Sequence, residues 1–131
     1  MNAELWEKAL AEGKAGDWTA ALETFRRAKE GKDDYAADHN CGIALFQLEK
    51  YSEAVQSFQQ ALAVNPEYWQ AYNHLGMALE RLGRNEEALA AYRKAVELKQ
   101  DYQAAWINLS NAYSLLGQTA QAAQALKKSF Y

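Results

Sequence analysis

The sequence predicts an all-α protein, a solenoid of four similar helical hairpins, and three observations support this fold class. Sliding residues 69–102 by 34 positions in either direction lays them onto similar sequence, and a period of this length is typical of a repeat array. Within each copy the apolar residues recur at helical spacing. The connections between helical segments need at most about five residues, which fits antiparallel neighbours.

The first hairpin is predicted at residues 3–14 and 18–29. Its apolar positions at helical spacing are Leu5, Trp6, Ala9 and Leu10, then Ala21, Leu22, Phe25 and Ala28. Gly16 and Asp17 separate the two helices, and the acidic residues of the cluster 31–34 suit the N-terminus of the next helix. This copy is the weakest, because Lys8 and Glu12 stand at positions that are apolar elsewhere.

Three further hairpins follow in register. Their first helices are expected at about 36–48, 69–82 and 103–116, and their second helices at about 52–64, 86–98 and 120–130. Ser52, Asn85 and Thr119 are the predicted N-caps of the second helices, since their side chains can accept from free amide groups. We expect one domain spanning residues 1–131, with repeats at about 2–34, 35–68, 69–102 and 103–131.

Small residues recur at fixed places in these hairpins. They are Gly42, Gly76 and Ser110 on the first helices, and Ala54, Ala88 and Ala122 on the second helices. Small side chains at facing positions let two helix backbones approach closely. We therefore predict that each hairpin closes through these positions.

Two blocks of sequence carry a family resemblance. Trp106, Leu109 and Tyr113 fit the pattern W-x2-L-G-x2-Y with serine in place of glycine, and Ala54, Phe58 and Pro66 fit A-x3-F followed by P. At these residues the chain resembles the tetratricopeptide repeat family. The resemblance implies a right-handed superhelical solenoid of four helix-turn-helix hairpins, whose first helices line a concave groove.

The second repeat departs from the pattern. Asp38 and Cys41 replace the expected aromatic residue and leucine, and Glu49 stands where the turn glycine is expected. Gln100 occupies the proline position of the third repeat. Cys41 is interpreted as a small buried hydrophobe, and a single cysteine excludes an internal disulfide.

The resemblance also implies which residues face the groove. The leading candidates form a column of Asn40, His74 and Asn108, whose neighbouring column is His39, Asn73 and Ile107, and Asn111 belongs to a second group toward the helix middles. A carboxamide offers both a donor and an acceptor, so such a column can bind the backbone of an extended peptide. The alternative is that these side chains face solvent or cap a neighbouring helix.

Apolar groove positions allow two interpretations. Leu10, Ile43, Phe46 and Met77 could form a pocket for one hydrophobic anchor of a ligand, or they could close gaps between hairpins. A clamp for the acidic tail of a chaperone is disfavoured. Trp6 and Leu10 stand where the family's lysine and asparagine would be, and Gln70 and His74 replace the later basic residues.

No pattern in the sequence indicates catalysis, a metal or a cofactor. His39 and His74, the only histidines, lie on different predicted helices without further zinc ligands at local spacing. The glycines fall at turns and packing positions rather than in a phosphate-binding loop. No nucleophile is paired with a base. We expect a protein that is not an enzyme.

The net charge and the length of the apolar runs limit which partners and which cellular location we expect. A net charge of −3 argues against nonspecific binding to nucleic acid. No run approaches the roughly 18 apolar residues of a membrane span, and residues 1–6 do not begin a secretory signal. The predicted location is the cytoplasm, away from membranes.

The sequence therefore predicts an interaction module, a scaffold or adaptor that binds a peptide or partner protein in its concave groove. A different class of function is self-assembly into a homo-oligomer through the C-terminal helix, whose apolar residues are Ala122, Ala125, Leu126 and Phe130. A third possibility is an adaptor fragment of a larger protein.

Overall fold

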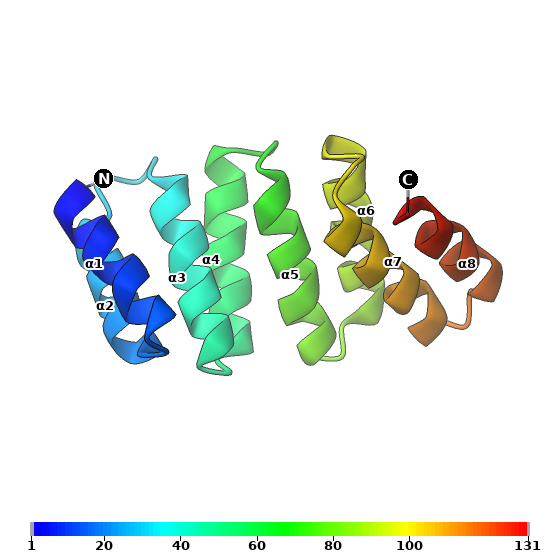
Figure 1. Cartoon of the computed structure of the whole chain (residues 1–131), viewed down its shortest axis with the longest axis horizontal. Helices are drawn as coiled ribbons and strands as arrows, with labels where there is room; N and C mark the ends of the chain where they lie inside the picture. Colours follow the sequence, from blue (N-terminus) through cyan, green and yellow to red (C-terminus); the bar gives the residue numbers. More distant parts are fainter. Residues whose placement is uncertain (1, 131) are drawn as a thin grey trace. The chain divides into compact units, whose positions relative to one another are not determined.

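A computed structural model describes residues 2–130, which form eight α-helices and no strand, as the all-α prediction requires (Figure 1). The chain divides into two compact units, Met1–Pro66 and Glu67–Tyr131, called unit 1 and unit 2 below. Each unit holds two hairpins. None of the helices within residues 2–130 combines the length and apolarity needed to cross a bilayer.

Unit 1 contains α1 (Ala3–Lys14), α2 (Trp18–Ala28), α3 (Tyr35–Gln47) and α4 (Tyr51–Val64). Helix α1 packs on α2, α3 packs on α4, and α2 packs on α3, so the second helix of one hairpin meets the first helix of the next. Phe25, Leu45 and Phe58 are the large buried side chains of its core, surrounded by buried alanines. The boundaries agree with the predicted hairpins to within two residues.

Unit 2 contains α5 (Trp69–Arg81), α6 (Asn85–Leu98), α7 (Gln103–Leu115) and α8 (Thr119–Lys128). It repeats the pairing of unit 1, with α5 on α6, α7 on α8 and α6 on α7, and it also brings α5 against α7. Its core is centred on Leu79, Tyr92, Val96 and Leu109. The same sequence pattern therefore gives the same packing twice.

Glycine allows close contact within two hairpins, as predicted. A Cβ atom added to Gly42 in α3 would lie 2.5 Å from Cε1 of Phe58, and one added to Gly76 in α5 would lie 2.6 Å from Cε1 of Tyr92. Real Cβ atoms do not approach a ring so closely, because interiors are packed to crystal-like density. The aromatic ring of the second helix thus lies directly on the glycine of the first.

The last hairpin uses a different pair at the same positions. Ser110 replaces the glycine, and Leu126 stands where the other hairpins have Phe58 or Tyr92. The Ser110 hydroxyl donates to the backbone carbonyl oxygen of Ala122 at 2.7 Å. A larger residue on one helix is therefore accompanied by a smaller one on the other.

The predicted N-caps of the second helices are wrong. Ser52, Asn85 and Thr119 lie inside the first turn, since α4, α6 and α8 begin at Tyr51, Asn85 and Thr119. The residues at the cap position are Lys50, Arg84 and Gln118, and none caps with its side chain. The equivalent turn before α2 has Asp17 at this position, and its carboxylate does cap the helix. Side-chain caps occur instead at Asn2, Asp17 and Asp34.

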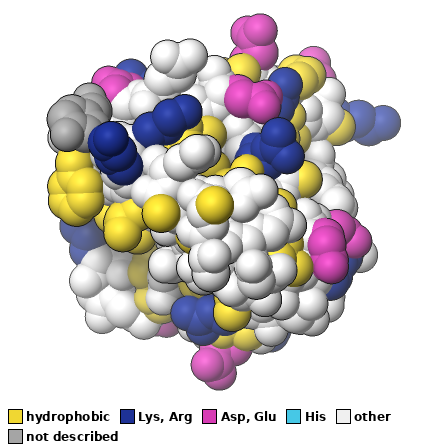
Figure 2. Space-filling view, turned by 90° about the vertical axis from the view of Figure 1, so that its right-hand side faces the viewer, with side chains coloured by type: hydrophobic (Ala, Val, Ile, Leu, Met, Phe, Trp, Pro, Cys, Tyr) yellow, Lys and Arg dark blue, Asp and Glu magenta, His cyan; other side chains and the backbone are white. Residues whose placement is uncertain are grey.

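Helix α8 and the residues directly after it expose large apolar side chains. Leu126 is 45% exposed and Phe130 is 73% exposed, whereas the equivalent Tyr92 and Val96 of α6 are buried. Figure 2, the view onto this end of unit 2, shows hydrophobic side chains gathered at the surface beside lysines and arginines. This surface is available for contact with another chain.

Candidate functional site

Unit 1 contains an open, mainly apolar pocket where α1, α2 and α3 meet. Its volume is about 330 Å³. Side chains of all three helices line it: Ala9, Leu10, Gly13, Lys14, Trp18, Phe25, Asn40 and Ile43. We call it the α1–α3 pocket. Apolar pockets of this size with a few polar groups at the edge are typical of ligand sites.

Local packing in the first hairpin forms one wall of this pocket. A Cβ atom added to Gly13 would lie 3.0 Å from Cζ3 of Trp18, so the indole rests against the α1 backbone. Trp18 opens α2 directly after Asp17, whose carboxylate accepts from the Ala20 amide at 3.2 Å. The N-cap therefore fixes the helix start that positions Trp18.

The Phe25 ring, which lines the pocket, packs against a second aromatic ring, that of Trp6. Phe25 is buried, and its ring meets that of Trp6 edge to face, with centroids 5.1 Å apart. Edge-to-face pairs add about 0.5–1.5 kcal/mol beyond the area they bury. The Phe25 ring thus offers a rigid surface to an apolar group of a ligand.

Two polar side chains mark the edge of the pocket. Nδ2 of Asn40 donates to the Ala36 carbonyl oxygen one turn earlier, at 2.8 Å. This bond orients the carboxamide and uses one of its N–H groups. Lys14 is exposed in the last turn of α1 and supplies the only charge among the lining residues. The pocket therefore combines apolar walls with an oriented amide and one cation.

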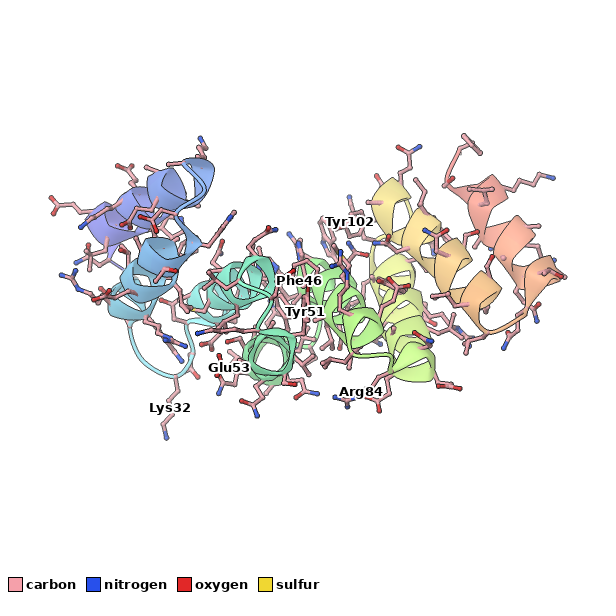
Figure 3. All side chains as sticks on the ribbon, turned by 90° about the horizontal axis from the view of Figure 1, so that it is seen from below. Lys32, Phe46, Tyr51, Glu53, Arg84 and Tyr102 are labelled. Atoms are coloured by element: carbon pink, nitrogen blue, oxygen red, sulfur yellow. The ribbon has the colours of Figure 1, made fainter. Side chains whose placement is uncertain are left out.

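The other predicted groove residues of unit 1 lie against aromatic rings. His39 is 6% exposed, and its ring centroid lies 5.8 Å from that of Phe58. Phe46 is half-buried and packs edge to face on Tyr51 at 5.3 Å (Figure 3). Of the four predicted apolar groove residues, Leu10 and Ile43 are brought together in the α1–α3 pocket.

Unit 2 joins two predicted groove residues in one partly buried network. Asn73 is 4% exposed, and its Oδ1 accepts from Nδ2 of Asn108 at 3.0 Å. Nδ2 of Asn73 donates to the hydroxyl of Tyr102 at 3.1 Å. The Tyr102 ring meets Trp69 edge to face at 4.8 Å. This network links α5 to α7 and orients the Asn108 carboxamide.

His74, Met77 and Asn111 complete the predicted set. His74 Nδ1 lies 2.9 Å from the carbonyl oxygen of Gln70, so this nitrogen carries the proton of the neutral ring. Burial lowers the pKa of His74 below its usual value, which favours the neutral form. Met77 is half-buried and Asn111 is exposed. The Asn40 and His74 side chains both bond to the carbonyl four residues earlier on their own helix.

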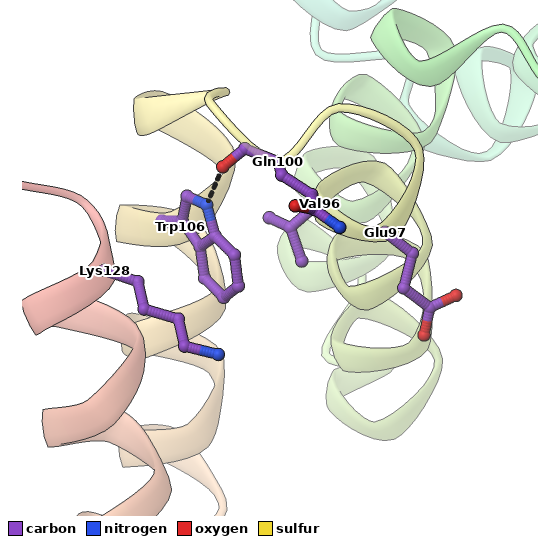
Figure 4. Close-up of a pocket in the computed structure, with 5 residues that line it drawn as sticks. All are labelled: Val96, Glu97, Gln100, Trp106 and Lys128. Atoms are coloured by element: carbon purple, nitrogen blue, oxygen red, sulfur yellow. Dashed lines mark hydrogen bonds between the residues drawn. The ribbon is translucent and has the colours of Figure 1, made fainter. Parts of the chain in front are cut away.

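A second hollow, of about 340 Å³, lies on unit 2 (Figure 4). The indole Nε1 of Trp106 donates to the Gln100 carbonyl oxygen at 2.7 Å, and Nζ of Lys128 lies 5.1 Å from the centroid of the ring. Val96 and Glu97 of α6 complete the lining. Trp106 is thereby fixed between α6 and α8, which is a packing role.

Sequence reasoning did not identify Trp18, Phe25 and Lys14 as lining residues. The first repeat is out of register by one residue, which hid the fact that Gly13 and Trp18 face each other. A glycine followed five residues later by tryptophan across a turn was the available signal. No group of three or more metal-binding side chains occurs within residues 2–130.

Comparisons with known proteins identify the repeats. Two family models described as tetratricopeptide repeat match residues 42–102 and 79–129. No curated protein matches the sequence.

Solved structures agree with this assignment. A crystal structure of MamA is 24% identical, with a TM-score of 0.89 over 96% of this chain and 74% of that chain. A thermophilic TPR protein of Thermus thermophilus is 24% identical, with a TM-score of 0.84 over 97% and 72%. The first TPR of Spaghetti (RPAP3), bound to HSP90 peptide SRMEEVD, is 26% identical, with a TM-score of 0.83 over 88% and 92%. These likenesses show the repeat solenoid fold.

Proposed function

Because the chain belongs to the tetratricopeptide repeat family, we propose that it is a non-enzymatic module that binds a segment of another protein along its first helices. The observation that carries this proposal is the α1–α3 pocket, which is lined by Leu10, Trp18, Phe25 and Ile43. An extended segment can place one apolar side chain there while its backbone runs past Asn40. We keep the cytoplasm as the proposed location.

The carboxamides of the first helices have the chemistry to hold a peptide backbone. Asn40 lies at the edge of the pocket, and its oxygen can accept from a ligand amide while Nδ2 stays on Ala36. In unit 2 we propose the same role for Asn108, His74 and Asn111. Asn73 is buried and hydrogen-bonded to both Asn108 and Tyr102. We therefore propose that Asn73 positions the Asn108 side chain.

The RPAP3 neighbour supports peptide binding by this fold, since its structure holds a chaperone peptide. The ligand proposed for the present chain differs. Trp6 and Leu10 stand where the resemblance places a lysine and an asparagine for an acidic chaperone tail. The apolar α1–α3 pocket favours a segment that is anchored by a hydrophobic side chain instead.

A peptide-display selection on the purified chain, followed by titration of enriched peptides, tests the proposal. We expect Ile43→Ala and Asn40→Ala each to weaken binding by about tenfold, since loss of a buried contact or hydrogen bond costs about 1.4 kcal/mol. Thermal unfolding should change little for Asn40→Ala, because that side chain bonds only to its own helix.

Asn85→Ala is the matched control, since Asn85 is a carboxamide at the start of a second helix. Its affinity should equal that of the unaltered chain. Two results would contradict binding at the α1–α3 pocket. The selection could enrich no peptide, or the enriched peptides could bind the Ile43→Ala and Asn40→Ala variants as tightly as the unaltered chain.

A second candidate function is self-association through α8. The observation that favours it is the exposure of Leu126 in α8 and of Phe130 just after that helix, whereas the equivalent positions in α6 are buried. Under this proposal, sedimentation velocity across a concentration series shows growing oligomers that Phe130→Ser abolishes. A monomer at every concentration would exclude this function.

A further inference from the structure

One cavity of unit 1 corresponds to two separate hollows at the equivalent place in unit 2. The cavity of unit 1 has a volume of about 360 Å³ and is lined by residues of α2, α3 and α4. Every one of its α3 and α4 lining residues, moved by 68 positions, is a lining residue of a cavity of about 100 Å³ in unit 2. Lys29, which also lines the cavity of unit 1, corresponds to Val96, which lines the hollow of about 340 Å³ described above. That hollow and the small cavity share Trp106 and Lys128, so Trp106 separates two spaces where unit 1 has one.

The division in unit 2 follows from the side chains. Asp38 and Cys41 of α3 correspond to Trp106 and Leu109 of α7, and Leu45 corresponds to Tyr113. The first two are the positions where the second repeat departs from its own pattern, and both departures replace a large apolar residue with a small one. We call the resulting cavity the α2–α4 pocket.

Charged residues of both signs line the α2–α4 pocket. Arg26 comes from α2, Lys29 directly follows that helix, Asp38 comes from α3 and Glu53 comes from α4. Nζ of Lys29 lies 2.8 Å from Oδ1 of Asp38, whose side chain is only 7% exposed, so these two charges satisfy each other. Arg26 and Glu53 take part in no ion pair within residues 2–130.

The remaining lining suits a polar ligand. Gln56, Ser57 and Gln60 of α4 add hydrogen-bonding groups beside Glu53, which projects from α4 (Figure 3). Cys41 is buried, and this burial raises the pKa of its thiol to about 11. The thiol is therefore neutral at physiological pH and contributes no charge. One cation from α2 and one anion from α4 thus line a polar cavity.

We propose that the α2–α4 pocket binds a zwitterion the size of an amino acid. The carboxylate of the ligand faces Arg26 and its ammonium group faces Glu53. A guanidinium binds a carboxylate through charge-assisted hydrogen bonds, and a carboxylate accepts from ammonium in the same way. A cavity of about 360 Å³ lies in the range of small-molecule sites. This site is separate from the α1–α3 pocket.

Titration of the full chain with each standard L-amino acid at millimolar concentration, followed by amide NMR shifts, tests the proposal. Saturable shifts should map to residues of α2 and α4. For the tightest binder, the α-amide and the N-acetyl form should each bind about tenfold more weakly, since each removes one charge-assisted contact. Equal affinity of the three forms would overturn the proposed orientation and the proposal with it.

Variants separate this pocket from the rest of the surface. Asp38→Trp with Cys41→Leu, the filled variant, introduces the two large side chains that divide this place in unit 2 and should abolish binding in a folded chain. Arg26→Gln and Glu53→Gln alter exposed side chains and should each weaken binding by about tenfold without affecting the fold. Arg93→Gln, at the equivalent exposed position of α6, should leave the affinity unchanged. Absence of binding by every amino acid, or binding that survives the filled variant, would refute the site.

Discussion

At the scale of single residues, the contact between Gly76 and Tyr92 shows how packing overrides helix propensity. Alanine is favoured over glycine inside a helix by about 1 kcal/mol. At Gly76 the added methyl group would lie 2.6 Å from Cε1 of Tyr92. Tyr92 is fully buried, so the ring cannot move aside without disturbing its neighbours.

We therefore expect Gly76→Ala to lower the free energy of unfolding by roughly 1–3 kcal/mol, the usual cost of overpacking. Urea unfolding followed by circular dichroism measures the change. Adding Tyr92→Leu should remove most of the clash, because Ser110 and Leu126 already combine a larger first residue with a smaller second one. Simple additivity of the two changes would contradict a direct clash.

At the scale of elements, three of the four turns between paired helices have glycine in the left-handed backbone region, and the fourth has glutamate there. Gly16, Gly83 and Gly117 have φ values of 82°, 76° and 75°, and Glu49 has a φ of 62° at the same place. A non-glycine residue in this region costs roughly 1–2 kcal/mol. The α3–α4 turn is thus strained at Glu49, whose side chain is exposed.

Glu49→Gly should raise the free energy of unfolding by about 0.5–1 kcal/mol, because the relief of strain exceeds the added entropy of the unfolded chain. Gly83→Ala is the reciprocal test and should lower it by about 1–2 kcal/mol, since its Cβ would meet nothing within 4 Å and only the backbone is strained. Chemical denaturation of both variants checks the pair. Destabilisation by Glu49→Gly would show that the side chain has a role beyond the turn.

Elements also show where local sequence signals are reliable. The apolar spacing predicted all eight helices, because a buried face imposes the helical period on the sequence. The same reasoning misplaced the caps at Ser52, Asn85 and Thr119. A tight turn with one left-handed residue binds the chain to the preceding helix, as Lys50 N to Leu45 O at 2.9 Å shows. The same backbone bond joins Asp17 N to Glu12 O before α2, where the Asp17 side chain does cap the helix. The other second helices lack a side-chain cap because Lys50, Arg84 and Gln118 occupy that position.

At the scale of the whole molecule, buried titratable groups link stability to pH. Burial lowers the pKa of His74 below its usual 6.5. The unfolded chain takes up a proton as the pH falls through 6.5, whereas folded His74 stays neutral to lower pH. This contribution to stability is complete above pH 6.5 and is lost as the pH falls through the folded pKa.

We expect urea unfolding free energies to decline between about pH 7 and pH 5, and His74→Gln to reduce that slope. Glutamine can still donate to the Gln70 carbonyl but does not titrate. The difference between the two proteins isolates the histidine, since all other titrating groups are shared. Identical slopes would show that His74 is equally solvated in both states.

The sequence by itself determined the helical class, the number of hairpins and the glycine positions at which they close. These features repeat every 34 residues, so each copy confirms the others. It also placed Leu10, Ile43 and Asn40 on the surface that the α1–α3 pocket presents.

Only the tertiary structure decided which side chains meet. The contacts of Trp18 with Gly13, and of Asn73 with Asn108 and Tyr102, join different helices whose relative rotation no local signal reports. The size of the α2–α4 pocket depends likewise on what three helices leave unfilled around Asp38 and Cys41. Periodicity fixes which face of a helix is buried, but packing fixes the partner and the space that remains.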